Sequence, residues 1–344
     1  MKRAFLGALV LSACLPGASA APAAAKLDAC KAIAYDADAV ACISRLIETG
    51  ALHGDASAEA LRMRGKLYAM DVVQPGLALA DLDRLIAMRP KPAEAHRQRG
   101  FVYYALGQYS RALTDFDKAV ALKPDFVEAV FLRAETLFAM RRYDRAISEY
   151  EKAMALRPAL APSLDLRRRE ARDLALLFGP SGPAKADAEN LLPRGTDTAP
   201  LFAACNDATH AEALRCAKIM LVMADYEDAV VNYRLAFPAP GLDSGWEFDR
   251  GHGKAAQGYV FAAAGHLDRA VASQPNLAEA WYLRALVGYH GYESERARGD
   301  VYHAIALRPD DAEAYILRAL VKRHAKDAAG AKADAQKAVK LLGK

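Results

Sequence analysis

A period of 34 residues is the feature of this sequence that most constrains its fold. The stretch GQYSRALTDFDKAVALKPD begins at Gly107, and 34 positions later, from Arg141, the chain reads RRYDRAISEYEKAMALRPA. The two copies place a tyrosine, an Arg-Ala pair, an aromatic residue and a basic-Pro pair at the same positions. Self-similarity at a fixed period of this length indicates units that cover one another's apolar faces in an array.

Small residues and a proline mark each unit, and each has a physical reason. Two antiparallel helices approach closely only where the facing side chains are small. A proline ends the second helix because it lacks an amide proton and disfavours helical geometry before it, and Gly107 stops the first helix. Each unit is therefore predicted to be a helix-turn-helix. The markers are Gly100, Ala112, Ala119 and Pro124; Ala134, Ala146, Ala153 and Pro158; Ala285, Ala297, Ala304 and Pro309; and Ala319, Ala331 and Ala338.

These units resemble the tetratricopeptide repeat. The residues that carry the resemblance are Gly100, Tyr103, Ala112, Phe116, Ala119 and Pro124. The resemblance implies an all-α fold, an α-solenoid of helix-turn-helix repeats wound into a right-handed superhelix. It also implies a concave groove lined by the first helices, which binds a protein or peptide segment.

Glycines and prolines between 179 and 209 predict a linker that separates two lobes. The N-terminal lobe is expected to span 21–178, with repeats near 58–92, 93–126 and 127–160 and a capping helix at 161–178. The C-terminal lobe is expected to span 210–344. Its repeats are placed near 210–243, 244–277, 278–311 and 312–344.

Two units depart from the pattern. In the unit near 210–243, the turn is predicted at Asp225–Asp228. The unit at 244–277 admits two registers. A 34-residue phase puts Gly265 inside the second helix, whereas the likeness of Gly265–Ala270 to Gly107–Ala112 puts Gly265 in the turn.

The first 20 residues are predicted to be a secretory signal peptide. Lys2 and Arg3 precede a short apolar run, and Ala18-Ser19-Ala20 supplies a small-x-small cleavage site. Leu11-Ser12-Ala13-Cys14 also resembles the bacterial lipobox, which implies lipidation of Cys14 as the alternative. We expect a periplasmic protein, or else an outer-membrane lipoprotein whose anchor at Cys14 is its contact with the membrane.

Export favours disulfides for the remaining cysteines. Cys30 and Cys42 form one local pair, and Cys205 and Cys216 form another. In an oxidising compartment, cysteines at this separation staple a helical hairpin. No His or second Cys lies two to four residues from any of them, so a metal site is not predicted.

Motifs for catalysis and for cofactors are not found. The sequence contains no HExxH, GxSxG or GxxxxGK motif, and a net charge of +4 gives no support to nucleic-acid binding. His210, near Cys205 and Cys216, is the only hint of a thiol nucleophile. We therefore expect no enzyme and no cofactor. An enzyme with a site around the linker and the irregular 244–277 unit is the alternative from a different class.

The residues around each small marker of the first helices are the candidate binding residues, because they point into the groove of a stacked array. Aromatic residues beside arginines are typical of protein-binding hot spots, although any one of these aromatics can instead pack between units. A cluster at Arg167–Arg172 is interpreted as a solvated helix face. The groove residues are Arg62, Lys66, Arg97, Phe101, Tyr104, Phe131, Glu135, Phe138, Tyr282, Tyr289 and Arg323, with Leu286, Ile316 and Leu320 beside them.

The sequence thus predicts a non-catalytic interaction scaffold or adaptor of the bacterial cell envelope. Its partner is expected to be a protein or peptide segment held in the groove. A regulatory subunit of an envelope assembly or polysaccharide-export machine is the nearest alternative. The partner and the oligomeric state do not follow from the sequence, because repeat arrays share a scaffold while they bind unrelated ligands.

Overall fold

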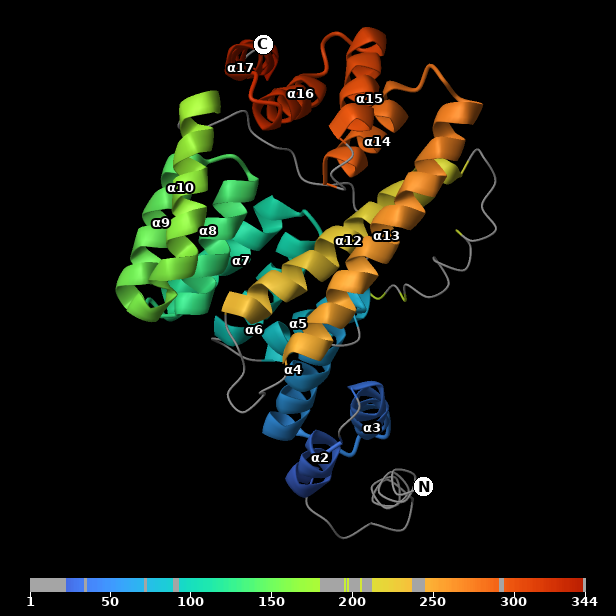
Figure 1. The fold of residues 1–344 in the computed structure, drawn as a ribbon. Coiled ribbons are helices and arrows are strands. Elements are labelled where there is room, and N and C mark those ends of the chain that lie inside the picture. The colour runs from blue at the N-terminus through green and yellow to red at the C-terminus, as the bar shows by residue number, and fades with distance from the viewer. Residues whose placement is uncertain are drawn as a thin grey trace. The chain divides into compact units, whose positions relative to one another are not determined.

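The chain folds as helical hairpins. The computed structural model describes residues 23–33, 36–70, 73–88, 93–179, 195, 197, 205, 212–236, 245–290 and 294–342, and these residues form no strand. Figure 1 shows consecutive antiparallel pairs such as α8 with α9 and α16 with α17. The prediction of an all-α solenoid of helix-turn-helix repeats is confirmed.

The helices begin and end close to the predicted repeat limits. They are α2 (Ala23–Lys31), α3 (Asp36–Glu48), α4 (Gly54–Met70), α5 (Pro75–Met88), α6 (Ala93–Ala105), α7 (Tyr109–Leu122), α8 (Val127–Ala139), α9 (Tyr143–Leu156), the short 3-10 helix η1 (Pro158–Leu160), α10 (Ala161–Phe178), α12 (Ala213–Ala236), α13 (Gly245–Ser273), α14 (Ala278–His290), α15 (Ser294–Leu307), α16 (Ala312–His324) and α17 (Ala328–Leu342).

Contacts divide the chain into two units. The first contains Met1–Val102 with Leu192–Thr198, and the second contains Tyr103–Leu191 with Ala199–Lys344. The division falls within α6, and the two-lobe arrangement separated by 179–209 stays a prediction. In the first unit the backbone N–H of Gly195, which belongs to the predicted linker, donates a hydrogen bond to the carbonyl of Gly76 at the start of α5.

The small marker residues lie where helices meet. Ala112, Ala119, Ala134, Ala146 and Ala153 are each fully buried. At Gly65 on α4, an added Cβ would lie 3.2 Å from Cγ of Leu82 on α5. A methyl group there would press against the side chain of the neighbouring helix, so the close approach of α4 and α5 requires a very small residue.

The turns between the two helices of a unit share a left-handed backbone position. Gly107 has φ +69°, and the equivalent residues of two other units are Arg141 with φ +60° and Lys326 with φ +63°. Glycine adopts this conformation freely, whereas a residue with a Cβ loses about 1 kcal/mol in it. Two of the turns therefore hold a long basic side chain at some cost in backbone strain.

The irregular region forms one long hairpin. Helix α12 runs without a break through Asp225–Asp228, so the turn predicted there is wrong. Helix α13 is also continuous, contains Gly265 and ends before Pro275. Both predicted registers assumed a turn within this unit, whereas α13 has none, and Gly265 lies inside the single helix.

In five of the units, an arginine directly before the small marker of the first helix pairs with carboxylates of adjacent helices. The guanidinium of Arg284 on α14 donates to both carboxylate oxygens of Asp300, 16 positions later on α15, each at 2.7 Å. It also donates to Asp268, 16 positions earlier on α13, at 3.0 Å. The same ladder recurs at Arg64 with Asp81, Arg99 with Asp83, Arg133 with Asp117 and Glu149, and Arg318 with Asp334.

We predict that Arg284→Ala destabilises the second unit by about 3 kcal/mol, because it leaves the buried carboxylate of Asp300 without its main counter-charge. Urea unfolding followed by circular dichroism measures the change. Arg298→Ala on α15 removes an exposed pair with Glu295 and is expected to change the free energy of unfolding by less than about 0.5 kcal/mol. Equal effects of the two substitutions would contradict a structural role for the ladder.

Candidate functional site

The predicted groove residues all lie on the first helices of their repeats, but they differ in burial. Lys66 on α4 and Arg323 on α16 are exposed. Arg62, Tyr104, Phe138, Tyr282 and Tyr289 are half-buried, and Arg97, Phe101, Phe131 and Glu135 are buried.

The buried aromatic residues act in packing. Phe101 on α6 is 1% exposed, and Phe131 on α8 is 6% exposed. A partner would reach neither ring without opening the helices around it. Arg97 is buried as well, and its guanidinium is 2.6 Å from a carboxylate oxygen of Glu94 one turn earlier. These three positions support the fold rather than offering contact surface.

Glu135 is the centre of a network that joins three helices. Its carboxylate accepts a hydrogen bond from the hydroxyl of Tyr150 on α9 at 2.5 Å and from the guanidinium of Arg167 on α10 at 2.6 Å. Burial, followed by the nearby charge of Glu135, raises the pKa of Tyr150 well above its usual value, so its hydroxyl stays a donor. Arg167 also lies over the ring of Phe138, 4.8 Å from its centroid.

The basic cluster of α10 is therefore only partly a solvated face. Arg167 pairs with Glu135, and Arg168 pairs with Asp165 and with Glu151 on α9. Arg169 and Arg172 are exposed, as expected of a solvated face. The interpretation of the whole cluster as solvated is wrong for the two arginines that pair across helices.

In five of the repeats, a glutamate lies on the first helix six residues before the small marker. Acidic residues in a first helical turn are favoured by the helix dipole, and the spacing of three residues to the next groove position puts both on one face. The regular spacing of these glutamates is visible in the sequence. The pairs are Glu59 with Arg62, Glu94 with Arg97, Glu128 with Arg157, Glu279 with Lys218 and Glu313 with Arg141.

The last of these pairs joins distant parts of the second unit. Arg141, in the turn after α8, donates through both terminal nitrogens to the carboxylate of Glu313 on α16, at 2.8 and 2.7 Å. The two residues are 172 positions apart in the chain. The predicted groove face of the last repeat is therefore in contact with the chain itself.

Apolar side chains continue this contact. Phe138, Tyr143, Leu174 and Phe178 form one core cluster with residues of α16 and α17. The residues from α16 and α17 in this cluster are Tyr315, Ile316, Ala319, Leu320, Ala335 and Ala338. Ile316 and Leu320, which were expected to line an open groove, are covered by α8, α9 and α10.

Three tyrosines around this contact stay neutral at physiological pH. Burial raises the pKa of Tyr143 to about 12, against the opposing charges of Arg141 and Arg323. Burial also raises the pKa of Tyr282 and of Tyr289 on α14. Neutral phenols near the Arg141–Glu313 pair exclude water without adding charge, which strengthens the ion pair.

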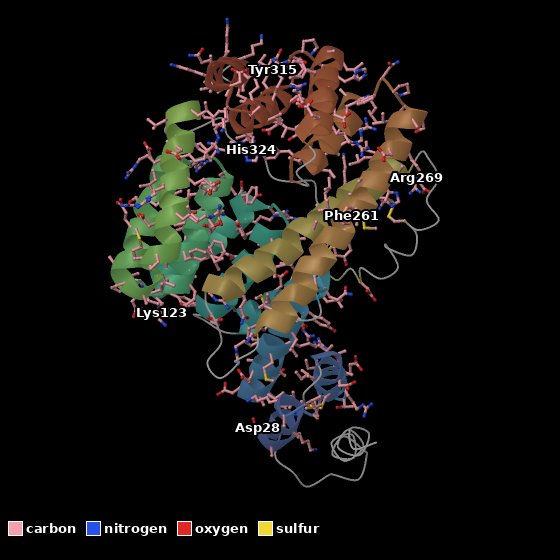
Figure 2. All side chains as sticks on the ribbon, viewed as in Figure 1. Asp28, Lys123, Phe261, Arg269, Tyr315 and His324 are labelled. Carbon is pink, nitrogen blue, oxygen red and sulfur yellow. A yellow bond between two sulfur atoms is a disulfide. The ribbon has the colours of Figure 1, made fainter. Side chains whose placement is uncertain are left out.

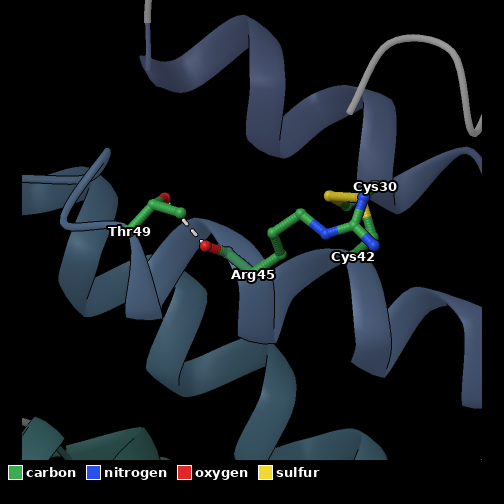
Figure 3. Close-up of a disulfide and its surroundings, with 4 residues drawn as sticks. All are labelled: Cys30, Cys42, Arg45 and Thr49. Carbon is green, nitrogen blue, oxygen red and sulfur yellow. Dashed lines mark hydrogen bonds between the residues drawn. A yellow bond between two sulfur atoms is a disulfide. The ribbon is translucent and has the colours of Figure 1, made fainter. Parts of the chain in front are cut away.

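Both predicted disulfides are present. Cys30 on α2 is bonded to Cys42 on α3, and Cys205 is bonded to Cys216 on α12. Figure 3 shows the first bridge next to Arg45, whose carbonyl accepts a hydrogen bond of 2.8 Å from the hydroxyl of Thr49 near the end of α3. Disulfides indicate an oxidising, extracytoplasmic compartment.

Other predicted features lie outside the described residues. These are the signal peptide, Cys14 and His210, together with most of the linker. In the described part of the chain, no helix is long and apolar enough to cross a membrane, and no group of three or more His, Cys, Asp or Glu side chains is placed to hold a metal ion.

Two family models match the chain, and both describe the tetratricopeptide repeat. One covers residues 65–134, and the other covers residues 127–160. The chain contains repeats of the tetratricopeptide family. Repeats of this family are in general non-catalytic scaffolds for protein interaction. This protein has the helix hairpins of such a scaffold. No curated protein matches the chain with significance.

Solved structures of tetratricopeptide proteins resemble the chain at low identity. MamA 41-end from Desulfovibrio magneticus RS-1 is 15% identical over 84% of this chain and 97% of its own, with a TM-score of 0.26. A repeat protein from Parabacteroides merdae ATCC 43184 is 12% identical over 90% and 93%, with a TM-score of 0.33. YrrB, described as having an unusual peptide-binding site, is 12% identical over 76% and 91%, with a TM-score of 0.25. These scores are too low for any of the three to inform the site.

We predict that replacing Cys30 and Cys42 with serine speeds hydrogen exchange in α2, because that nine-residue helix loses the cross-link to α3. The loss for a loop of this length is about 3 kcal/mol in the chain-entropy view. Hydrogen exchange read by mass spectrometry localises the effect. The matched double variant of Cys205 and Cys216 is expected to leave α2 protected, and unchanged exchange of α2 in the first variant would show that the bridge does not hold it.

Proposed function

We propose that this protein is a non-catalytic scaffold of the bacterial cell envelope that binds a protein or peptide segment on its first-helix faces. The observation that carries the proposal is the row of first-helix residues that remain accessible while their neighbours are buried. Lys66 is exposed and Arg62 half-buried on α4, and Tyr104 is half-buried at the end of α6. Repeat arrays bind through a few such anchors rather than through a reacting centre.

The accessible anchors favour an acidic segment. On α4 the exposed ammonium of Lys66 lies one turn after Arg62, so a bound carboxylate can meet two cations. Arg62 is held in place by Glu59, with nitrogen to oxygen distances of 2.6 and 2.7 Å. A guanidinium that is already oriented loses less conformational entropy when a ligand arrives.

An envelope location is supported by the disulfides and by the basic, apolar and small-residue order of the first 20 residues. We propose a periplasmic protein released after Ala20. N-terminal sequencing of the mature protein from a bacterial envelope fraction is expected to begin at Ala21. A chain that begins at a lipidated Cys14 would instead make it an outer-membrane lipoprotein.

The binding surface can be tested by site-specific photo-crosslinking in the native envelope. A photo-reactive phenylalanine analogue at position 66 is expected to capture a partner. Lys66→Glu is expected to weaken that capture at least tenfold, because it places a negative charge where we expect an acidic ligand.

Lys118 provides the matched control, because it is an exposed lysine on α7, a second helix. The analogue at position 118 is expected to capture nothing, and Lys118→Glu is expected to leave capture at position 66 unchanged. Capture that is equal at positions 66 and 118, or that survives Lys66→Glu, would place the binding surface elsewhere. Circular dichroism confirms that each variant keeps its helices.

A further inference from the structure

The concave face of the last repeat is already occupied, and its occupant shows what that face recognises. Arg141, in the turn after α8, donates two parallel hydrogen bonds to the carboxylate of Glu313. Tyr143, two residues later, packs in the apolar cluster with Ile316 and Leu320. We call these contacts, with those of Leu174 and Phe178, the closing contact. Figure 2 labels Tyr315 near the start of α16 and His324 at its end.

We propose that this face is a receptor for a partner segment that carries an arginine followed two positions later by an aromatic residue, and that the protein's own Arg141-Arg142-Tyr143 turn occupies it as an internal competitor. The proposal deepens the proposed scaffold function and rests on it for the existence of a partner. It assigns the last repeat a ligand chemistry opposite to that of Lys66: a basic aromatic segment.

The charge arrangement of the face matches this ligand. The carboxylate of Glu313 is about one third exposed even with Arg141 bound, so a competing guanidinium can approach it. A planar guanidinium is the group that fits a carboxylate through two parallel hydrogen bonds. The phenol of Tyr282 lies near both charges and stays neutral, because burial raises its pKa.

The closing contact combines an apolar part with an ion pair that solvent can still reach. Its apolar part includes large side chains, such as Tyr143 and Ile316, together with three alanines from α16 and α17. The ion pair is more open, because the side chain of Glu313 keeps about one third of its surface exposed. A competing guanidinium would therefore exchange with Arg141 first.

The pairing with Glu313, rather than the backbone, distinguishes Arg141 from the equivalent residues of other turns. Gly107 has φ +69° and no side chain at this position. Lys326 has a similar φ of +63°, so a basic residue in this conformation is a property of the turn. Arg141 is the one that donates to both carboxylate oxygens of Glu313.

Charge reversal tests the closing contact in the full-length protein. Arg141→Glu and Glu313→Arg are each expected to open it, and the double variant is expected to close it again. Small-angle X-ray scattering reads the change as a larger radius of gyration for each single variant and the wild-type value for the double. Lys326→Glu is the matched control, since Lys326 has the same turn position and a similar φ of +63°. A radius that does not change in either single variant, or that changes equally in Lys326→Glu, would overturn the proposal.

A peptide tests the receptor directly. The probe is a fluorescent peptide of residues 137–147, LFAMRRYDRAI, and fluorescence anisotropy measures its binding. The Arg141→Glu protein is expected to bind it at least tenfold more tightly than wild type, because its own turn no longer competes. The same peptide with alanine in place of Arg141 is expected to bind at least tenfold more weakly. The proposal would be overturned if wild type and Arg141→Glu bound the peptide equally, or if the peptide with alanine bound as tightly as the original. It would also be overturned if neither protein bound the peptide.

Two further readouts separate the other possibilities. A wild-type dimer in sedimentation velocity that Arg141→Glu abolishes would show that a second copy fills the face in trans, against the internal competitor. Photo-crosslinking at position 66 reports the scaffold function by itself. If position 66 captures no partner while Arg141→Glu still enlarges the protein and binds the peptide more tightly, the scaffold function is rejected and the closing contact is kept. If position 66 captures a partner while Arg141→Glu changes neither the radius of gyration nor peptide binding, only the closing contact is rejected.

Discussion

The arginine ladder is the interaction on which the rest of the array depends. Small residues let two helices approach closely, and an array of similar units offers such residues at more than one position. A guanidinium that must meet carboxylates 16 positions before and after it fixes the phase of three successive helices. Arg284 does this for α13, α14 and α15, and so it holds an unusually long helix in the same register as the regular repeats. Burial of these charges makes a wrong register costly, since it would leave a carboxylate unpaired.

Once the ladder fixes the stacking, the first-helix faces acquire a regular charge pattern. Five of the faces carry a glutamate six residues before the small marker, and these glutamates pair with cations from the same helix or from other elements. In the first repeats the cation comes from the same helix, as with Arg62 and Arg97. On the last repeat it comes from Arg141, far away in the chain. One repeated acidic position thus serves both to orient groove arginines and to close the last face.

The sequence predicted the architecture more fully than the surface. The period, the buried alanines and the position of Gly107 follow from steric rules that act within one hairpin, so local sequence was sufficient. Burial of Phe101 and Glu135 was not predictable in the same way, because it depends on which neighbouring helix covers them. The continuous course of α12 through Asp225–Asp228 was missed because acidic residues with a tyrosine fit a turn and an exposed helix equally well. The arginines of the ladder and the first-helix glutamates recur at regular positions that the sequence shows. The residues with which they pair could not be predicted from it.

The contact between Arg141 and Glu313 could not be predicted from the sequence, since nothing local relates residues 172 positions apart. It changes how a repeat array should be interpreted. A solenoid with open faces presents all of its repeats to a partner at once, whereas one with a covered face presents only part of them until something competes for the cover. Because a ligand shifts such an equilibrium only by its differential affinity for the open form, the strength of the closing contact sets how selective the last repeat is. The two parallel hydrogen bonds between Arg141 and Glu313 make this threshold specific for a guanidinium.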